Sequence, residues 1–178
     1  MAVCAAACER EQDGEEWAGA AGHAAQRRVR SVPTLWTIGY EKLLPPELLA
    51  ELEAAGIQRL IDVRHRPQSR RPGMSKTRLG AMLAERGIAY EHRRELGTPP
   101  DIRWFFKHNR AAEGATAFRA HAERAAAGEL DALAGELRAR TAPRTALLCL
   151  EADPALCHRR QLTELLSERL PDLEVVDL

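Results

Sequence analysis

Short β-rich segments alternate with helical segments from Thr34 to the C-terminus, and this alternation limits the fold more than any other feature of the chain. Residue type and apolar spacing predict strands over TLWTIG, IQRLIDV, IAYEH, TALLCLE and LEVVDL. The TALLCLE segment is almost continuously apolar, as is typical of a central strand covered on both faces. Because strands that alternate with helices pair in parallel through crossovers, we predict an α/β fold. Residues 33–178 are expected to form a single three-layer domain with a mainly parallel sheet of about five strands.

The helices predicted between these strands have recognisable ends. PPELLAELEAAG and SKTRLGAMLAERG are expected to stop at Gly56 and Gly87, and Ser75 is expected to cap the second. The stretch from Ile102 to Arg140 is predicted to form two helices broken near Gly114, and ALCHRRQLTELLSERL a last one. Residues 1–32 show no sustained apolar period, so we predict a disordered or weakly helical extension.

The composition limits the location and the classes of site. The 178 residues contain no apolar run near the length of a membrane span and no signal-peptide pattern at the start, so a cytoplasmic protein without a membrane partner is expected. The four cysteines are expected to be free thiols in a reducing compartment. No Cys-x-x-Cys occurs, so a structural zinc site is not expected. No metal and no cofactor are predicted. The oligomeric state is left open.

In open parallel sheets, ligands bind beyond the carboxyl ends of the strands. This rule selects four loops, at residues 39–41, 64–71, 92–101 and 151–159. Most of the polar residues without an evident place in a core lie in these loops. A functional site is therefore predicted at this edge of the sheet.

The first cluster in these loops is Cys157-His158-Arg159. Asp153 and Pro154 are expected to start the last helix, which would place Cys157 in its first turns, where the helix dipole and nearby cations lower a thiol pKa. Arg159 can hold a phosphate together with the helix N-terminus. The alternative is that Cys157 is a small buried hydrophobic residue and that the arginines are solvated. Cys149, at the end of an apolar run, is interpreted as a core residue.

The second cluster follows the second strand. Asp62 ends that strand, and Arg64 and Arg70 follow it within a segment, Arg59 to Arg94, that has ten Lys and Arg but three Asp and Glu. Such a loop favours an anionic ligand, whereas the alternative is a solvated basic loop in which Asp62 makes a structural salt bridge.

Three further features of these loops carry weaker signals. Glu151 could join Asp62 in acid–base chemistry, although capping or ion pairing is the more ordinary role for such a residue. His92 ends the third strand, where the alternative to a binding role is a half-buried polar residue. The aromatic run Trp104–Phe106 is interpreted as core rather than as a platform for base stacking.

Four motifs together resemble the family called "domain of unknown function 488": TIGY, IDVRHRPQSRR, GIAYEHRRELG and LLCLEADPALCHRRQL, in this order between about Thr34 and Leu178. The residues that match the motifs of the family are Gly39, Asp62, Arg64, Pro67, Ser69, Arg70, Leu96, Gly97, Cys157, His158 and Arg159. The resemblance implies an α/β domain with a functional site at these motifs, and it implies a link of some members to nucleic-acid base chemistry.

These patterns favour an enzyme that acts on a nucleotide or nucleic-acid substrate, with no cofactor. Cys157 or His158 would be the nucleophile or acid–base group, with Asp62 as its partner. The residues expected to bind the substrate are Gly39, Tyr40, Arg64, Ser69, Arg70, His92 and Arg159. The alternatives are a non-catalytic module that binds phosphate or nucleic acid and, with less support, a thiol redox or sulfur-transfer protein, which would need Cys149 close to Cys157. Full burial of Cys157 would argue against thiol chemistry and leave anion binding intact.

Overall fold

Five parallel strands form a central sheet. The structure is a computed structural model that describes residues 32–178. The strands are β1 (Thr34–Gly39), β2 (Arg59–Asp62), β3 (Ala89–His92), β4 (Thr145–Cys149) and β5 (Glu174–Asp177). Their order is β3-β2-β4-β1-β5, and all four neighbouring pairs are parallel. The predicted α/β class and parallel sheet are confirmed. The extension predicted over residues 1–32 lies, except for its last residue, outside the described part of the chain.

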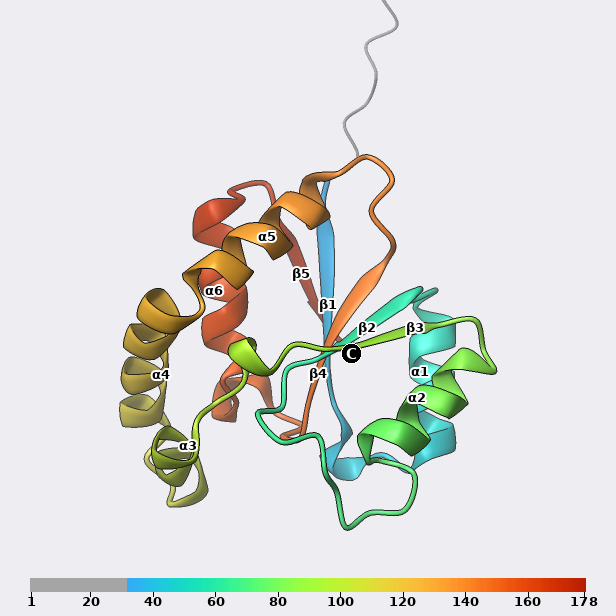
Figure 1. Ribbon diagram of the computed structural model, residues 1–178, viewed down its shortest axis with the longest axis horizontal. Helices are drawn as coiled ribbons and strands as arrows, with labels where there is room; N and C mark the ends of the chain where they lie inside the picture. The colour runs from blue at the N-terminus through green and yellow to red at the C-terminus, as the bar shows by residue number, and fades with distance from the viewer. Residues whose placement is uncertain (1–31) are drawn as a thin grey trace, which may run out of the picture. The chain divides into compact units, whose positions relative to one another are not determined.

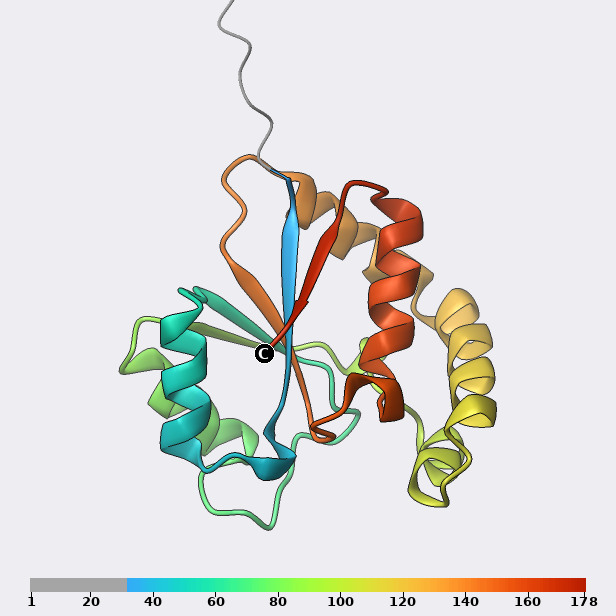
Figure 2. The ribbon, with the colours of Figure 1, turned by 180° about the vertical axis from the view of Figure 1, so that it is seen from behind.

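Helices cover both faces of this sheet and complete three layers (Figures 1 and 2). The helices of residues 32–178 are α1 (Pro45–Ala54), α2 (Lys76–Ala84), α3 (Pro100–Lys107), α4 (Ala111–Ala125), α5 (Ala127–Arg138) and α6 (Arg159–Arg169). Helices α1 and α2 lie on one face, and α4, α5 and α6 lie on the other (Figure 1). None of the described helices is both long enough and apolar enough to cross a membrane.

Each face of the sheet has its own hydrophobic core, because successive side chains of a strand point to opposite faces. On β2, Leu60 packs with the α1–α2 layer, and Ile61 packs with the α4–α6 layer. On β4, Leu147 and Leu148 divide in the same way. Every residue of β4 is buried, which confirms the prediction of a central strand.

The ends of the first two helices also agree with the sequence. Gly56 and Gly87 have φ angles of 64° and 70°, in the left-handed region that glycine adopts at the end of a helix. Ser75 precedes α2 as predicted, but its hydroxyl donates to the backbone oxygen of Ser69 and accepts from the Ser69 N–H. It therefore closes the basic loop and does not cap the helix.

The stretch after residue 100 differs from the prediction of two helices broken near Gly114. It forms three helices, α3 to α5, which are separated at residues 108–110 and at Ala126. Gly114 lies inside α4, where a Cβ atom would come within 3.0 Å of the Phe106 ring. The glycine therefore allows α3 and α4 to pack closely and does not mark a break.

The start of the last helix also differs. Asp153 caps a short 3₁₀ turn, η3 (Pro154–Leu156), by accepting from the Ala155 N–H at 2.8 Å. Cys157 then returns to extended backbone, and α6 begins at Arg159. Cys157 therefore lies before the helix and not in its first turns, which corrects the prediction.

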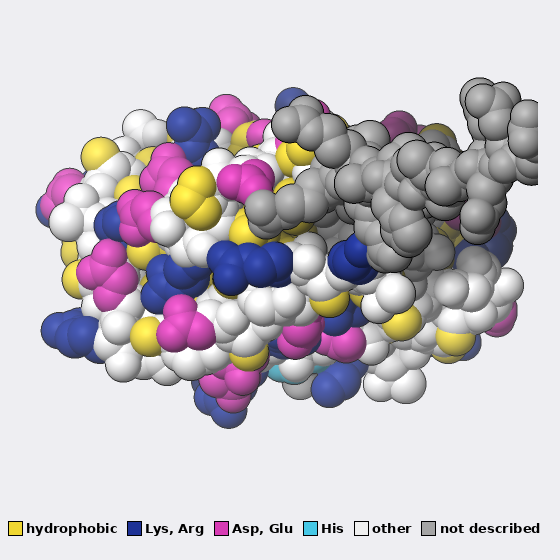
Figure 3. Space-filling model, turned by 90° about the horizontal axis from the view of Figure 1, so that it is seen from above, with side chains coloured by type: hydrophobic (Ala, Val, Ile, Leu, Met, Phe, Trp, Pro, Cys, Tyr) yellow, Lys and Arg dark blue, Asp and Glu magenta, His cyan; other side chains and the backbone are white. Residues whose placement is uncertain are grey.

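Acidic and basic side chains are interspersed on the face seen from above, toward the amino ends of the strands (Figure 3). No single-sign patch dominates what is visible there. The pocket described below lies at the opposite edge of the sheet, beyond the carboxyl ends of the strands.

Candidate functional site

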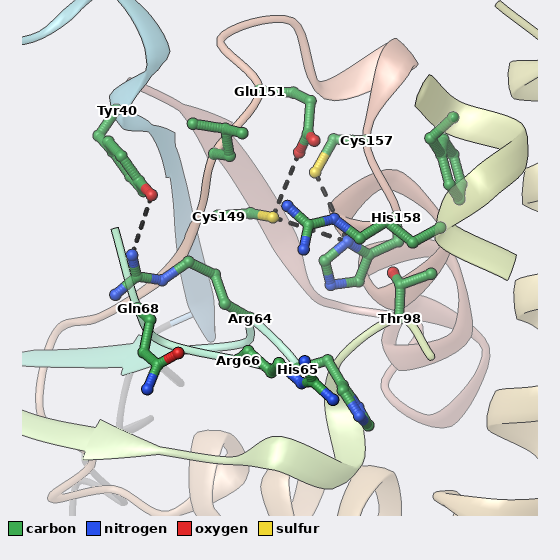
Figure 4. Close-up of a pocket in the computed structure, with 13 residues that line it drawn as sticks. Tyr40, Arg64, His65, Arg66, Gln68, Thr98, Cys149, Glu151, Cys157 and His158 are labelled. Atoms are coloured by element: carbon green, nitrogen blue, oxygen red, sulfur yellow. Dashed lines mark hydrogen bonds between the residues drawn. The ribbon is translucent and has the colours of Figure 1, made fainter. Parts of the chain in front are cut away.

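A pocket with about 40 Å³ of accessible space inside it opens beyond the carboxyl ends of the strands (Figure 4). It takes residues from all four loops that the sequence singled out, together with the end of β4 and two side chains of α3. These residues are Tyr40, Arg64, His65, Arg66, Gln68, Thr98, Arg103, Phe106, Cys149, Leu150, Glu151, Cys157 and His158.

Two cysteines and a histidine, which we call the floor cluster, meet at the base of the pocket. The Nδ1 atom of His158 lies 3.7 Å from the sulfur of Cys149 and 3.7 Å from the sulfur of Cys157. These three atoms all lie within 4.8 Å of one another. Cys149 comes from the end of β4, and the other two come from the junction between η3 and α6, so two separate segments supply the cluster.

A backbone carbonyl sets the orientation of the His158 ring. Its Nε2 atom lies 3.1 Å from the carbonyl oxygen of Val63, which can only accept a hydrogen bond. Nε2 therefore carries a proton and donates it, and Nδ1 faces the two sulfurs. The ring of Phe118 packs edge-on against the imidazole, with 5.0 Å between the centroids.

Contacts at the floor of the pocket shift the pKa values of the two cysteines and of the neighbouring Glu151 in different directions. Burial opposes ionisation of Cys157, but the hydrogen bond with Cys149 and the charge of His158 hold the pKa of Cys157 well below its usual value. The hydrogen bond to Cys157, together with burial, raises the pKa of Cys149. Burial, followed by the charge of Cys157, raises the pKa of Glu151. The carboxyl of Glu151 accepts a hydrogen bond from the Cys149 thiol at 3.3 Å.

Asp62 and Arg64 form a closed ion pair beside the pocket. Asp62 is 0% exposed, and its two oxygens accept hydrogen bonds from Arg64 at 2.8 and 2.5 Å and from the Tyr90 hydroxyl at 2.6 Å. Arg64 also donates to the Tyr40 hydroxyl and to the carbonyl of Met74. Burial works against the charge of Arg64, but Asp62 outweighs it and raises the pKa of the guanidinium. Because both partners are engaged within the protein, this geometry fits the salt-bridge alternative.

Arg159 is also engaged within the protein. It is 1% exposed, and its Nη2 donates to the backbone oxygens of Glu151 at 2.7 Å and of Ala152 at 3.3 Å. Gly39 lies against the same backbone, where a Cβ atom would fall 1.8 Å from the Glu151 oxygen. Arg159 and Gly39 therefore hold the segment that carries Glu151 into the pocket.

Two further arginines, Arg66 and Arg103, line what we call the mouth of the pocket. Unlike Arg64 and Arg159, they are not held by partners among residues 32–178. Within the described part of the chain, the side chains of Arg66 and Arg103 make no hydrogen bond or ion pair, although both line the pocket. His65 also lines the pocket, and burial, with the charges of Arg94 and Arg66, lowers its pKa. Of the residues that line the pocket, Glu151 is the one acidic side chain. The mouth is therefore positively charged.

The remaining predicted residues lie around this pocket and not in it. Ser69 accepts from the backbone of Arg71 within the basic loop, and Arg70 is exposed outside the pocket lining. His92 lies 2.8 Å from the carbonyl of Arg64 and faces an adjacent depression that also includes Arg66. The structure thus brings Cys157, His158, Arg64 and Tyr40 to the pocket. It places Ser69, Arg70 and His92 outside the pocket lining.

Sequence reasoning missed four lining residues that matter here. Cys149 was interpreted as core and Glu151 as a cap or ion-pair partner, yet their positions at the end of the central strand signalled the site edge. Arg103 gave no signal, because the sequence does not show that α3 turns this face toward the pocket. Thr98 lies in the selected loop at residues 92–101 but was not singled out within it. The Thr98 hydroxyl is buried without a hydrogen-bond partner in the described chain.

Comparison with known proteins agrees with the resemblance seen in the motifs. The family model described as "Domain of unknown function DUF488" matches residues 45–166, more than half of the chain. No curated protein and no solved structure gives a significant match. The chain belongs to the DUF488 family of domains of unknown function.

Proposed function

We propose that this domain is an enzyme that acts on a phosphate-bearing substrate of the nucleotide or nucleic-acid class. The observation that carries the proposal is the pairing of two unengaged arginines, Arg66 and Arg103, with the floor cluster of one pocket. A planar guanidinium binds phosphate oxygens through two parallel hydrogen bonds, so the mouth suits such a group. We assign the phosphate contact to these two residues, since Arg64 and Arg159 are engaged elsewhere.

An aromatic surface beside the mouth supports a substrate that contains a base. Trp104 is 45% exposed and lines a depression next to the pocket. His65, Arg66 and Arg103 line both the depression and the pocket. Its ring stacks on His108 with 4.2 Å between the centroids. Stacking on an aromatic ring is the usual way in which proteins hold an unpaired base. The run Trp104–Phe106, interpreted from the sequence as core, thus divides, with Trp104 at the surface and Phe106 in the pocket wall.

The burial of Cys157 bears on the chemistry. Its side chain is 1% exposed, which argues against direct attack by its sulfur on a substrate. Glu151 is only partly buried and lines the same pocket. The acid–base role at the floor therefore suits Glu151 better than Cys157.

The burial of Cys157 argues against thiol redox chemistry, but one observation favours it as a second candidate function. Cys149 lies against Cys157, so the second cysteine that such a role needs is present. Two thiols and one molecule of peroxide would give one disulfide and two molecules of water. Peptide mapping after peroxide treatment would reveal a Cys149–Cys157 bond if this second function holds.

Arg66→Ala and Arg103→Ala are each expected to weaken the binding of a nucleotide by about 1.5–3 kcal/mol, the range for a hydrogen bond to a charged group. Titration calorimetry with nucleoside mono-, di- and triphosphates and a short single-stranded DNA measures this change. Binding is also expected to weaken as salt rises, because the mouth attracts anions. Arg70→Ala is the matched control, since Arg70 is an exposed arginine outside the pocket lining.

Equal affinities of the two mouth variants and the parent would contradict phosphate binding at this mouth. Turnover separates an enzyme from a binding module. Glu151→Gln is expected to retain nucleotide binding and lose turnover, because the amide cannot exchange the proton that a carboxylate can. Binding without turnover in the unmodified protein, across the whole panel, would identify a binding module instead.

A further inference from the structure

We propose that Cys149, Cys157 and His158 bind a zinc ion, with the fourth coordination position open to the pocket. The inference deepens the proposed function and rests on it only for the role of the pocket as a substrate site. It departs from the sequence analysis, which predicted no metal and found no Cys-x-x-Cys in the chain. The ligands come instead from two separate elements that the fold brings together.

The spacing of the floor cluster fits a tetrahedral ion. With Zn–S near 2.3 Å and Zn–N near 2.0 Å, a tetrahedral site separates a sulfur from a nitrogen by about 3.5 Å. Both Sγ–Nδ1 distances here are 3.7 Å. A tetrahedral ion separates its two sulfurs by about 3.8 Å. The two sulfurs here lie within 4.8 Å of each other, so they need to approach by at most about 1 Å.

The histidine is oriented as a metal ligand is. A ligating imidazole commonly donates its other ring N–H to a backbone carbonyl or a carboxylate, which fixes the ring and the free nitrogen. In His158, Nε2 donates to the carbonyl of Val63, and Nδ1 faces the sulfurs (Figure 4). Binding of the ion displaces any proton on Nδ1 and on the thiols.

A purely structural role explains this arrangement less well. A buried imidazole that only stabilises a core would place a strong donor or acceptor against Nδ1. The partners of Nδ1 are instead the sulfur atoms of two cysteines, and no oxygen or nitrogen atom of residues 32–178 bonds to it. Thiolates and imidazole are the ligands that zinc prefers.

The surroundings suit a catalytic ion. Three protein ligands with one open position are typical of catalytic zinc, whereas structural sites are closed by four. The three ligands line the pocket together with Glu151, whose carboxyl reaches Cys149 but lies outside the floor cluster. Two cysteines and a histidine with a nearby glutamate are also the groups by which zinc deaminases activate water.

These groups define a balanced hydrolytic step on the proposed substrate. A zinc-bound water gives one proton to Glu151, and the resulting hydroxide forms a bond to the electrophilic atom of the substrate. The bond to the leaving group breaks, and Glu151 returns the proton to that group. No oxidant or second substrate is needed.

Metal analysis of the purified full-length chain tests the inference. About one zinc ion per chain is expected after dialysis, and Cys149→Ser or Cys157→Ser should reduce zinc affinity by at least about 10- to 100-fold. The control is Cys4→Ser combined with Cys8→Ser, which removes the two cysteines outside the described residues and should leave the zinc content unchanged. Loss of zinc in this control, or full retention in Cys149→Ser and Cys157→Ser, would overturn the assignment.

Cobalt substitution tests the unmodified protein, so the result does not depend on whether a variant folds. Co²⁺ in the site should show the visible bands of a tetrahedral ion together with thiolate-to-cobalt charge transfer. Glu151→Gln should keep this spectrum, because Glu151 is not a ligand. An octahedral spectrum, a spectrum without charge transfer, or loss of the ion in Glu151→Gln would contradict the three-ligand site.

The zinc site and the proposed function can be contradicted independently of each other. Calorimetry with the mouth variants tests phosphate binding, and metal content with cobalt spectra tests the floor cluster. A chain that binds zinc but no nucleotide would keep the metal site and remove the proposed substrate class.

Discussion

Replacing Asp62 by asparagine is expected to lower the free energy of unfolding by about 3–5 kcal/mol, the range for removal of one partner from a buried ion pair. The substitution keeps the shape of the side chain and removes its charge. It leaves the Arg64 guanidinium, 6% exposed, without its counter-ion. Since a domain is typically stable by 5–15 kcal/mol, this loss is a large part of the total. Urea unfolding followed by circular dichroism measures it.

The effect should extend to the pocket, because Arg64 connects several segments. It joins the end of β2 to the Tyr40 hydroxyl and to the carbonyl of Met74, and so closes the loop that carries His65 and Arg66. The loosened loop should therefore bind phosphate more weakly in Asp62→Asn, even though neither Asp62 nor Arg64 is assigned a contact with the ligand.

An exposed ion pair provides the matched control. Glu53→Gln breaks the pair of Glu53 with Arg86, whose side chains are 41% and 48% exposed, and should cost no more than about 1 kcal/mol. If the two variants unfold at the same urea concentration, Asp62 is not the anchor of the loop, and the ion pair has no more weight than a surface contact.

Much of the fold could be predicted because local patterns and the global fold agree. The apolar run of β4 indicated a central strand, and the alternation of strands and helices indicated a parallel sheet. From that sheet followed the most useful prediction, that loops distant in sequence meet at one edge. The pocket draws on all four of those loops.

The roles within the site were less accessible, because they depend on which side chains pair after folding. Arginine count and spacing do not distinguish Arg64 from Arg66. Arg64 is hydrogen-bonded to Asp62, whereas the side chain of Arg66 has no such partner among the described residues. Cys149 and Cys157 are eight positions apart, and their contact depends on the extended residue between η3 and α6. The sequence predicted a continuous helix there, so this local backbone was not anticipated.

Gly39→Ala is expected to destabilise the domain by roughly 3 kcal/mol, the upper end of what an added methyl group costs in a tightly packed place. A Cβ atom at Gly39 would lie 1.8 Å from the oxygen of Glu151 and 2.9 Å from the Cα of Ala152. Both neighbours are backbone atoms, so no side chain can rotate away to relieve the clash. Either β1 or the segment after β4 has to shift. Urea unfolding measures the loss.

Gly135→Ala is the control for Gly39→Ala, and it should change stability in the opposite direction. Gly135 lies in α5, and a Cβ atom there would have no neighbour within 4 Å. Alanine should therefore stabilise that helix by about 0.5–1 kcal/mol. The shift in Gly39→Ala should also move Glu151 and Cys149, since Arg159 holds this same backbone against the pocket. A Gly39→Ala protein as stable as the parent would show that the two strand ends are not in contact. In that case the close approach that brings Glu151 to the floor cluster would be absent as well.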